Sequence, residues 1–119
     1  MVFVASIAAG YGSREYPLYA MAKAALMSWV RSLASEFGPS GVRVNAVAPG
    51  PVLTPRMKVA WNSDKQAELA DGSVLKRIGL PEEIGSVIAF LISDASSAIT
   101  GQSIVADGGM SIRDPAYGG

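Results

Sequence analysis

The sequence contains no cysteine and no histidine. The first absence excludes disulfides and thiol nucleophiles, and the second removes the commonest catalytic base and a major transition-metal ligand. Any proton transfer must therefore use Tyr, Lys, Asp or Glu, and no metal site is expected. No window approaches 18 uninterrupted apolar residues, so a membrane span is not expected. The N-terminus lacks the charged region that opens a signal peptide, and we expect a cytoplasmic protein.

Charge is also sparse. Only 17% of the residues are charged, and 10 basic side chains balance 10 acidic ones. A nucleic-acid-binding surface needs a basic stripe, so nucleic acid is not expected as a partner. By contrast, half of the 119 residues are hydrophobic, a high fraction for one small domain. We expect apolar surface to be buried against another subunit or a missing segment.

Apolar residues alternate between strand-like runs and helical periodicity. Residues 6–17 are expected to form a loop, and a short helix is expected around 65–70. The main pattern predicts strands over 1–5, 41–48 and 99–106, and long helices over 18–37 and from 81 onward. This alternation predicts a parallel α/β layer. The long helix should end at Gly38-Pro39, and the later one should begin at Pro81-Glu82-Glu83.

Tyr19 and Lys23 are four residues apart and share one helix face. The pKa of a free tyrosine lies near ~10, so tyrosine is a poor base at neutral pH. An ammonium about 4 Å away, at an effective dielectric of ~20, would stabilise a phenolate by about 4 kcal/mol. The pair can therefore transfer a proton, although Tyr-x-x-x-Lys alone also occurs by chance. Ser6 follows the first strand, where it is either an ordinary loop residue or a hydroxyl that holds a substrate oxygen.

Five ordered motifs resemble the short-chain dehydrogenase/reductase family. They run from Val2 to about Met110 and are Ser6 followed by Tyr19-Ala-Met-Ala-Lys23, Gly41-Val-Arg-Val-Asn45, Pro49-Gly50 with Thr54, Arg77-Ile-Gly-Leu-Pro81, and Thr100-Gly-Gln-Ser-Ile-Val-Ala-Asp107-Gly-Gly. The resemblance implies the C-terminal part of a Rossmann-like, doubly wound parallel-sheet fold. It also implies hydride transfer between NAD or NADP and an alcohol or carbonyl substrate.

The resemblance assigns roles residue by residue. Tyr19 would be the catalytic acid/base, Lys23 would bind nicotinamide-ribose hydroxyls, and Ser6 would hydrogen-bond the substrate oxygen. Four further residues would line the nicotinamide end of the cofactor, namely Pro49, Gly50, Val52 and Thr54, with Tyr19 and Lys23 beside them.

Several other positions have two interpretations. Val52 could offer backbone groups to the carboxamide or simply pack. Leu53, Met57 and Trp61 could line a substrate lid or be packing residues. Asn45 is expected to pin a strand end, and Asp107-Gly-Gly is expected to be a structural turn.

The family's glycine-rich phosphate loop and its Asn-Asn-Ala-Gly segment have no counterpart in these residues. Gly10 and Gly12 follow the wrong element to replace that loop. We therefore expect residues 1–119 to form a partial domain that lacks the N-terminal nucleotide-binding half and binds cofactor weakly. Two hypotheses remain, an oxidoreductase that needs the missing half and a non-catalytic remnant or oligomerisation module. The resemblance implies homo-oligomer contacts through 18–37 and 81–106, or pairing with the missing half.

Overall fold

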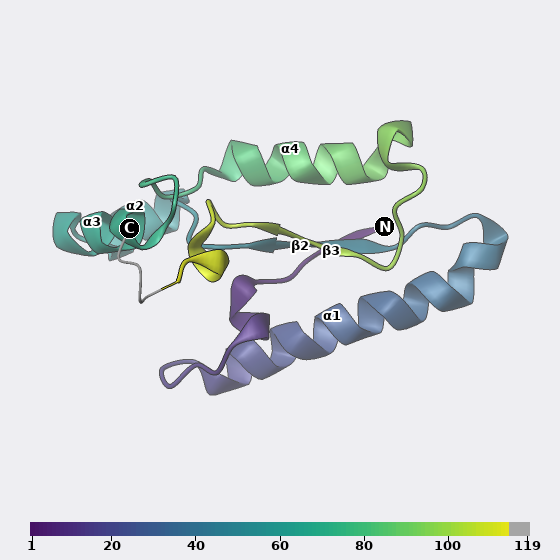
Figure 1. Ribbon diagram of the computed structural model, residues 1–119, viewed down its shortest axis with the longest axis horizontal. Helices are drawn as coiled ribbons and strands as arrows, with labels where there is room; N and C mark the ends of the chain where they lie inside the picture. The colour runs from purple at the N-terminus through teal and green to yellow at the C-terminus, as the bar shows by residue number, and fades with distance from the viewer. Residues whose placement is uncertain (115–119) are drawn as a thin grey trace.

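Three parallel strands form the centre of the computed structural model, which describes residues 1–114 (Figure 1). The strands are β1 (Val2–Val4), β2 (Asn45–Pro49) and β3 (Ser103–Ala106), and they lie in the order β1-β2-β3. Both strand pairs are parallel. The predicted parallel α/β layer is therefore confirmed.

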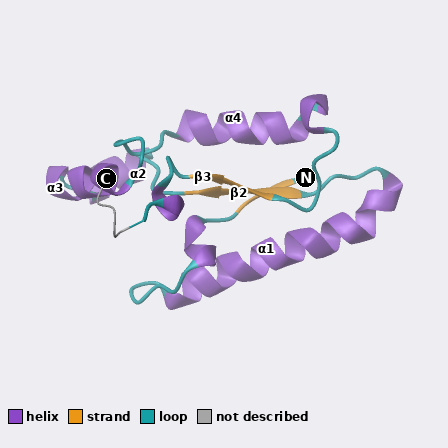
Figure 2. Cartoon of the chain, in the orientation of Figure 1, coloured by secondary structure: helices purple, strands orange, loops and turns teal. Residues whose placement is uncertain are grey.

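Two long helices cover the two faces of the sheet. Helix α1 (Pro17–Phe37) lies on one face and α4 (Pro81–Ile92) on the other (Figure 2). The shorter helices α2 (Pro55–Ala60) and α3 (Ser63–Gly72) lie beyond the ends of β2 and β3 (Figure 1). Within residues 1–114, no helix has the length and apolarity needed to cross a bilayer.

The main core lies between the sheet and α1. Val30, Leu33 and Ala34 project from α1 onto the sheet at spacings of three and four residues, which lie on one helix face. Not all apolar residues of α1 are buried, because Leu18 is 73% exposed and Trp29 is 54% exposed. These side chains lie on an apolar stripe of α1 that is rotated away from the core.

The far end of α4 is attached to the sheet by Arg43. Its guanidinium donates to the carbonyls of Ser93 (3.0 Å) and Ile99 (3.1 Å), and to the hydroxyl of Ser96 (3.0 Å). These acceptors lie at and just after the C-terminus of α4, where helix carbonyls lack helical partners. Arg43 therefore ties the segment that follows α4 to the start of β2.

All three expected strands begin later than predicted, and β1 covers Val2–Val4 rather than 1–5. Residues 41–44 form a connection in which Gly41 has φ 77°, so β2 begins only at Asn45. Gly101 has φ 71°, and the preceding residues form a turn, so β3 begins at Ser103. Both are left-handed conformations that glycine adopts without strain and that interrupt a strand.

Three helical elements also differ from the predictions. The 6–17 loop contains a short 3₁₀ helix, η1 (Ile7–Gly10), and the helix expected at 65–70 extends over all of α3. Helix α2 is too short to produce a periodic signal. The sequence also predicts a loose tail over 111–119, of which residues 115–119 lie outside the described residues.

Asn45 is the buried polar residue that joins β2 to the approach of β3. Its side-chain amide donates to the carbonyl of Ile99 (2.8 Å), and its oxygen accepts from the amide of Gln102 (3.0 Å). The side chain is completely buried. The structure thus gives Asn45 the strand-pinning role that the sequence predicted.

Candidate active site

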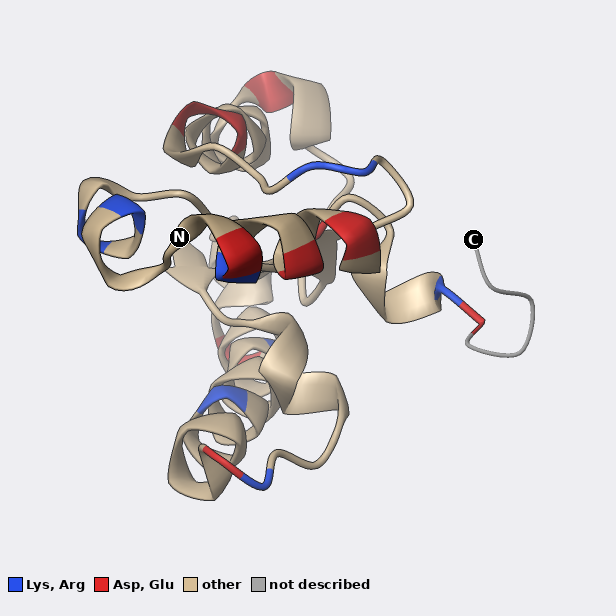
Figure 3. Cartoon of the chain, turned by 90° about the vertical axis from the view of Figure 1, so that its left-hand side faces the viewer, with Lys and Arg blue, Asp and Glu red and all other residues tan. Residues whose placement is uncertain are grey.

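The site is built where the three parallel strands end. Ser6 follows β1, Gly50 follows β2 and Asp107 follows β3, so all three lie at the same edge of the sheet. Ligands of open parallel α/β sheets bind at this edge. Figure 3 views the molecule from this side and shows acidic and basic residues distributed over several elements.

Tyr19 and Lys23 lie on consecutive turns at the start of α1. Pro17 opens the helix, which places Tyr19 in its first turn with 50% of its surface exposed. The Lys23 ammonium lies 5.6 Å from the centroid of the Tyr19 ring and donates to the carbonyl oxygen of Val4 at 2.9 Å. Lys23 therefore connects the helix that carries Tyr19 to the strand that leads to Ser6.

The Val4 carbonyl lies at the outer edge of the sheet. The amide of Ala5 donates to Val47, and the carbonyl of Met1 accepts from Asn45. In a strand, alternate residues direct their backbone groups to alternate sides, so those of Val4 point away from β2. The ammonium of Lys23 provides a donor for that outward-facing carbonyl.

Ser6 caps η1 immediately after β1. Its hydroxyl oxygen accepts from the backbone amide of Ala8 at 3.1 Å, and η1 packs against α1. A serine hydroxyl carries one hydrogen and two lone pairs, so this bond leaves the hydrogen able to contact a substrate oxygen. Ser6 thus lies two residues beyond Val4, the residue bonded to Lys23.

The expected cofactor-lining residues form the connection from β2 to α2. Gly50 donates to the carbonyl of Ala106 (3.2 Å), and Val52 forms a parallel bridge with Gly79. The Thr54 hydroxyl caps α2 by accepting from the amide of Met57 at 3.2 Å. The loop of residues 49–54 is therefore fixed at both ends, at the same sheet edge as Ser6.

The three residues that could line a substrate lid are half-buried. Leu53, Met57 and Trp61 all have intermediate exposure. Leu53 also lines an apolar hollow beside α3, together with Ala67 and Leu80. These positions are compatible with both the packing and the lid interpretations.

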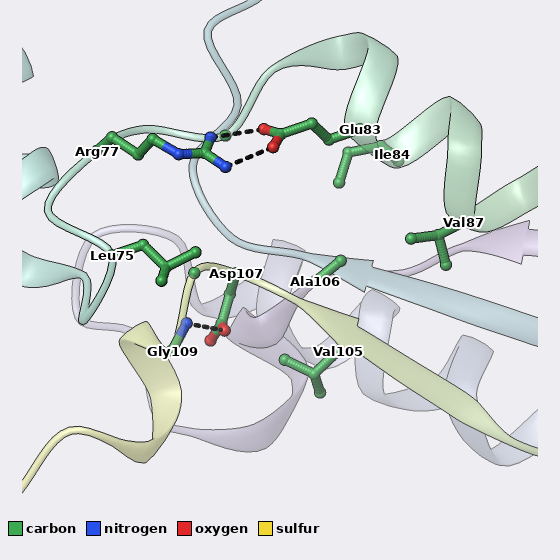
Figure 4. A pocket seen from close by; sticks show the side chains of 11 residues that line it. Leu75, Arg77, Glu83, Ile84, Val87, Val105, Ala106, Asp107 and Gly109 are labelled. Atoms are coloured by element: carbon green, nitrogen blue, oxygen red, sulfur yellow. Dashed lines mark hydrogen bonds and ion pairs between the residues drawn. The ribbon is translucent and has the colours of Figure 1, made fainter.

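A separate cavity of about 260 Å³ lies between α4, the end of β3 and the segment that follows α3 (Figure 4). Its rim carries an ion pair in which Arg77 donates to Glu83 at 2.8 Å. Hydrogen bonds from Arg77, which has the larger effect, and from the backbone amide of Leu80 lower the pKa of Glu83 to about 2. Sequence reasoning did not single out this pair, although Glu83 lies at the helix position where a carboxylate caps the N-terminus.

Comparisons with known proteins identify the family. Residues 1–111 match the family model described as enoyl-(acyl carrier protein) reductase. The chain belongs to the short-chain dehydrogenase/reductase family. An uncharacterized oxidoreductase of Bacillus subtilis is 45% identical over 109 residues, which cover 92% of this chain and 45% of that protein.

Solved structures support the same assignment. A 4-hydroxyisoleucine dehydrogenase mutant complexed with NADH and succinate has a TM-score of 0.88 and 32% identity, and the match covers 95% of this chain and 47% of that one. A Brucella melitensis protein described as a ribose-5-phosphate isomerase has a TM-score of 0.90 and 38% identity, with coverages of 99% and 47%.

The chain therefore spans less than half the length of the relatives that it matches. The Rossmann-type dehydrogenase fold and membership of an oxidoreductase family are shown. The names of the relatives differ in substrate and even in reaction, so no substrate transfers from them.

Proposed function

We propose that this chain supplies the catalytic Ser–Tyr–Lys side of a nicotinamide-dependent oxidoreductase acting on an alcohol or carbonyl. The observation that carries the proposal is the attachment of Lys23 to Val4, which holds the ammonium beside Tyr19 and bonds it to the strand residue two positions before Ser6. Tyr19 would move the proton at the substrate oxygen, and Ser6 would hold that oxygen. NAD or NADP would supply or accept the hydride.

The residues present fit the nicotinamide end of such a cofactor. Lys23 offers an ammonium for ribose hydroxyls, and residues 49–54 form a fixed loop at the same sheet edge. The hydroxyl of Tyr19 belongs to a half-exposed side chain and can reach a bound substrate. The pyrophosphate would need a glycine-rich turn and a helix N-terminus beyond these residues.

The test joins residues 1–119 to the N-terminal portion of the Bacillus subtilis oxidoreductase and follows NADH and NADPH oxidation with a panel of carbonyl compounds. Tyr19→Phe is the test variant, and Tyr11→Phe is the matched control because its half-exposed ring belongs to the loop before α1. The proposal expects turnover that Tyr19→Phe nearly abolishes and Tyr11→Phe leaves in place. Cofactor binding without any reduction across the panel would contradict it.

A second candidate function is an assembly module without catalysis of its own. The observation in its favour is the number of large apolar side chains that the chain leaves exposed on its two long helices, among them Leu18, Met21, Trp29, Phe90 and Ile92. Such surfaces mark interaction sites. Self-association of the isolated chain through α1 and α4, together with an inactive joined protein, would favour this alternative.

A further inference from the structure

Asp107 holds a tight turn at the end of β3. Its carboxylate accepts from the backbone amides of Gly109 at 2.8 Å and Ser111 at 2.7 Å. Gly108 and Gly109 both have positive φ, 64° and 82°, and form the turn. The bond between Asp107 and Gly109 is drawn in Figure 4.

The loop of residues 49–54 rests directly on this turn. A Cβ atom added at Gly50 would lie 2.7 Å from the Cβ and 3.0 Å from the Cα of Asp107. Contacts this short are excluded by packing, so glycine is required here by the proximity of Asp107. The amide of Gly50 also donates to Ala106, the residue before Asp107.

The opposite side of the turn holds the segment that follows α3. The amide of Leu75 donates to the carbonyl of Gly108 at 3.0 Å. A Cβ atom added at Gly109 would lie 2.8 Å from the Cβ of Val74, so these backbones also approach closely. The turn is therefore clamped between the 49–54 loop and residues 74–75.

The two segments on either side of the turn, the 49–54 loop and residues 73–79, are also hydrogen-bonded to each other. The amide of Leu53 donates to the carbonyl of Gly79 at 2.8 Å, and the amide of Gly79 donates to Pro51 at 3.2 Å. Closer to the turn, the buried hydroxyl of Ser73 donates to the carbonyl of Arg77 at 3.0 Å. The turn, the loop and the 73–79 segment thus form a closed ring of contacts.

We propose that Asp107 is a positioning residue, which sets the placement of the 49–54 loop through its contact with Gly50 and through the 73–79 segment. The structural turn expected from the sequence is present, and the proposal adds a positioning role to it. That the 49–54 loop contacts a cofactor rests on the function proposed above. The coupling between Asp107 and this loop does not depend on that function. The carboxylate fixes the turn, the turn fixes Gly50 and Leu75, and the bridge to Gly79 fixes Leu53.

Amide hydrogen exchange on the 119-residue chain, without cofactor, tests the coupling. The reporters are the amides of Leu75 and Leu53, and the reference is the amide of Ala46, a buried residue of β2 that donates to Gln102. Asp107→Ala should accelerate exchange of both reporters about tenfold or more relative to Ala46, because local opening replaces opening of the whole domain. In Asp107→Asn, the exchange rates of Leu75 and Leu53 should lie between those of the wild type and Asp107→Ala, since the side-chain oxygen can still accept from Gly109.

A steric arm uses two backgrounds that both lack the carboxylate. Gly50→Ala should accelerate exchange at Leu53 more in Asp107→Ala, which keeps the opposing Cβ, than in Asp107→Gly, which removes it. If Gly50→Ala prevents folding, the Asp107 series still decides the question. The coupling is overturned if Leu53 follows Ala46 in every Asp107 variant, because the residue then acts only on global stability. Since no cofactor is present, this result and the activity of the joined protein can fail independently.

Discussion

The ammonium of Lys23 donates to the carbonyl oxygen of Val4 at 2.9 Å, across 19 residues of sequence. This bond attaches the first turns of α1 to the outer edge of β1. It places a cation beside Tyr19, and the acceptor of its hydrogen bond is a backbone carbonyl rather than a carboxylate. The positive charge of Lys23 is therefore not neutralised by the group that holds it.

Lys23→Ala should affect the joined protein twice. Loss of the ammonium removes the proposed contact with the ribose hydroxyls and also removes the cation beside Tyr19. We therefore expect a higher Kd for NADH and a lower kcat, whereas Tyr19→Phe should lower kcat with little change in Kd. Fluorescence titration and steady-state kinetics separate the two effects. Equal Kd values for Lys23→Ala and the wild type would assign Lys23 to the proton step alone.

The 119-residue chain alone should bind NAD(H) and NADP(H) weakly or not at all. The proposed contacts reach only the nicotinamide end, and the pyrophosphate normally sits on a helix N-terminus after a glycine-rich turn. Isothermal calorimetry with each cofactor measures this directly. A micromolar Kd for either one would show that the nicotinamide contacts suffice.

The chain should associate through α1. Leu18, Met21 and Trp29 are each more than half exposed, and apolar burial contributes roughly 25 cal/mol per Å². Burial of a few hundred Å² would therefore contribute several kcal/mol, which offsets part of the entropy lost on association. Light scattering coupled to size exclusion should show a dimer or larger species, and Leu18→Glu with Trp29→Glu should shift it toward the 12.3 kDa monomer.

The control for that shift is Val59→Glu, because Val59 is 89% exposed but lies on α2. It should leave the association state unchanged. A wild-type chain that stays monomeric at tens of micromolar would contradict the prediction, as would dissociation by Val59→Glu alone.

Asn45→Ala should destabilise the fold. The substitution leaves the amide of Gln102 without its acceptor and removes one of the two donors to the carbonyl of Ile99, which keeps Arg43. A buried group left unsatisfied costs about 1–3 kcal/mol. Chemical denaturation gives the difference in unfolding free energy. Asn62→Ala is the matched control, because Asn62 caps the exposed start of α3 and its loss should cost only ~1 kcal/mol. Equal losses for both variants would show that Asn45 does not pin the strands.

Acid should weaken the attachment of α4 through Glu83. Its pKa falls from 4.5 to about 2 on folding, so its contribution is fully present above pH 4.5 and is lost as the pH falls toward about 2. Glu83→Gln should therefore flatten the stability profile within this window. Denaturant melts between pH 2 and 6 measure it, with Glu82→Gln as the control. Parallel profiles for wild type and Glu83→Gln would contradict the assignment.

The sequence predicted elements with strong periodicity or clear end signals. Pro81 with Glu82 and Glu83 marked the start of α4, and the apolar run at the N-terminus marked β1. Sequence patterns did not predict how far individual side chains are buried, because tertiary contacts determine this. Trp29 has helical spacing with the other apolar residues of α1, yet its side chain is 54% exposed. The centroid of its ring lies 5.7 Å from that of Phe3.

The site shows the same division. Ser6, Tyr19 and Lys23 could be proposed as site residues because motif spacing along the chain is a sequence property. The hydrogen-bond acceptor of Lys23 could not be predicted, because it is a backbone carbonyl, which every residue has. The contact between Gly50 and Asp107 joins positions 57 residues apart, and only the ring of loops around the turn reveals it.

The strand order β1-β2-β3 repeats the order of the strands along the chain. No connection within residues 1–114 therefore has to pass over a strand contributed from elsewhere. Any further strand can add at the margin of β1 or β3 by lateral docking, without threading through this unit. This topology is suited to split-protein reassembly, in which a second polypeptide would add its strands beside β1 or β3.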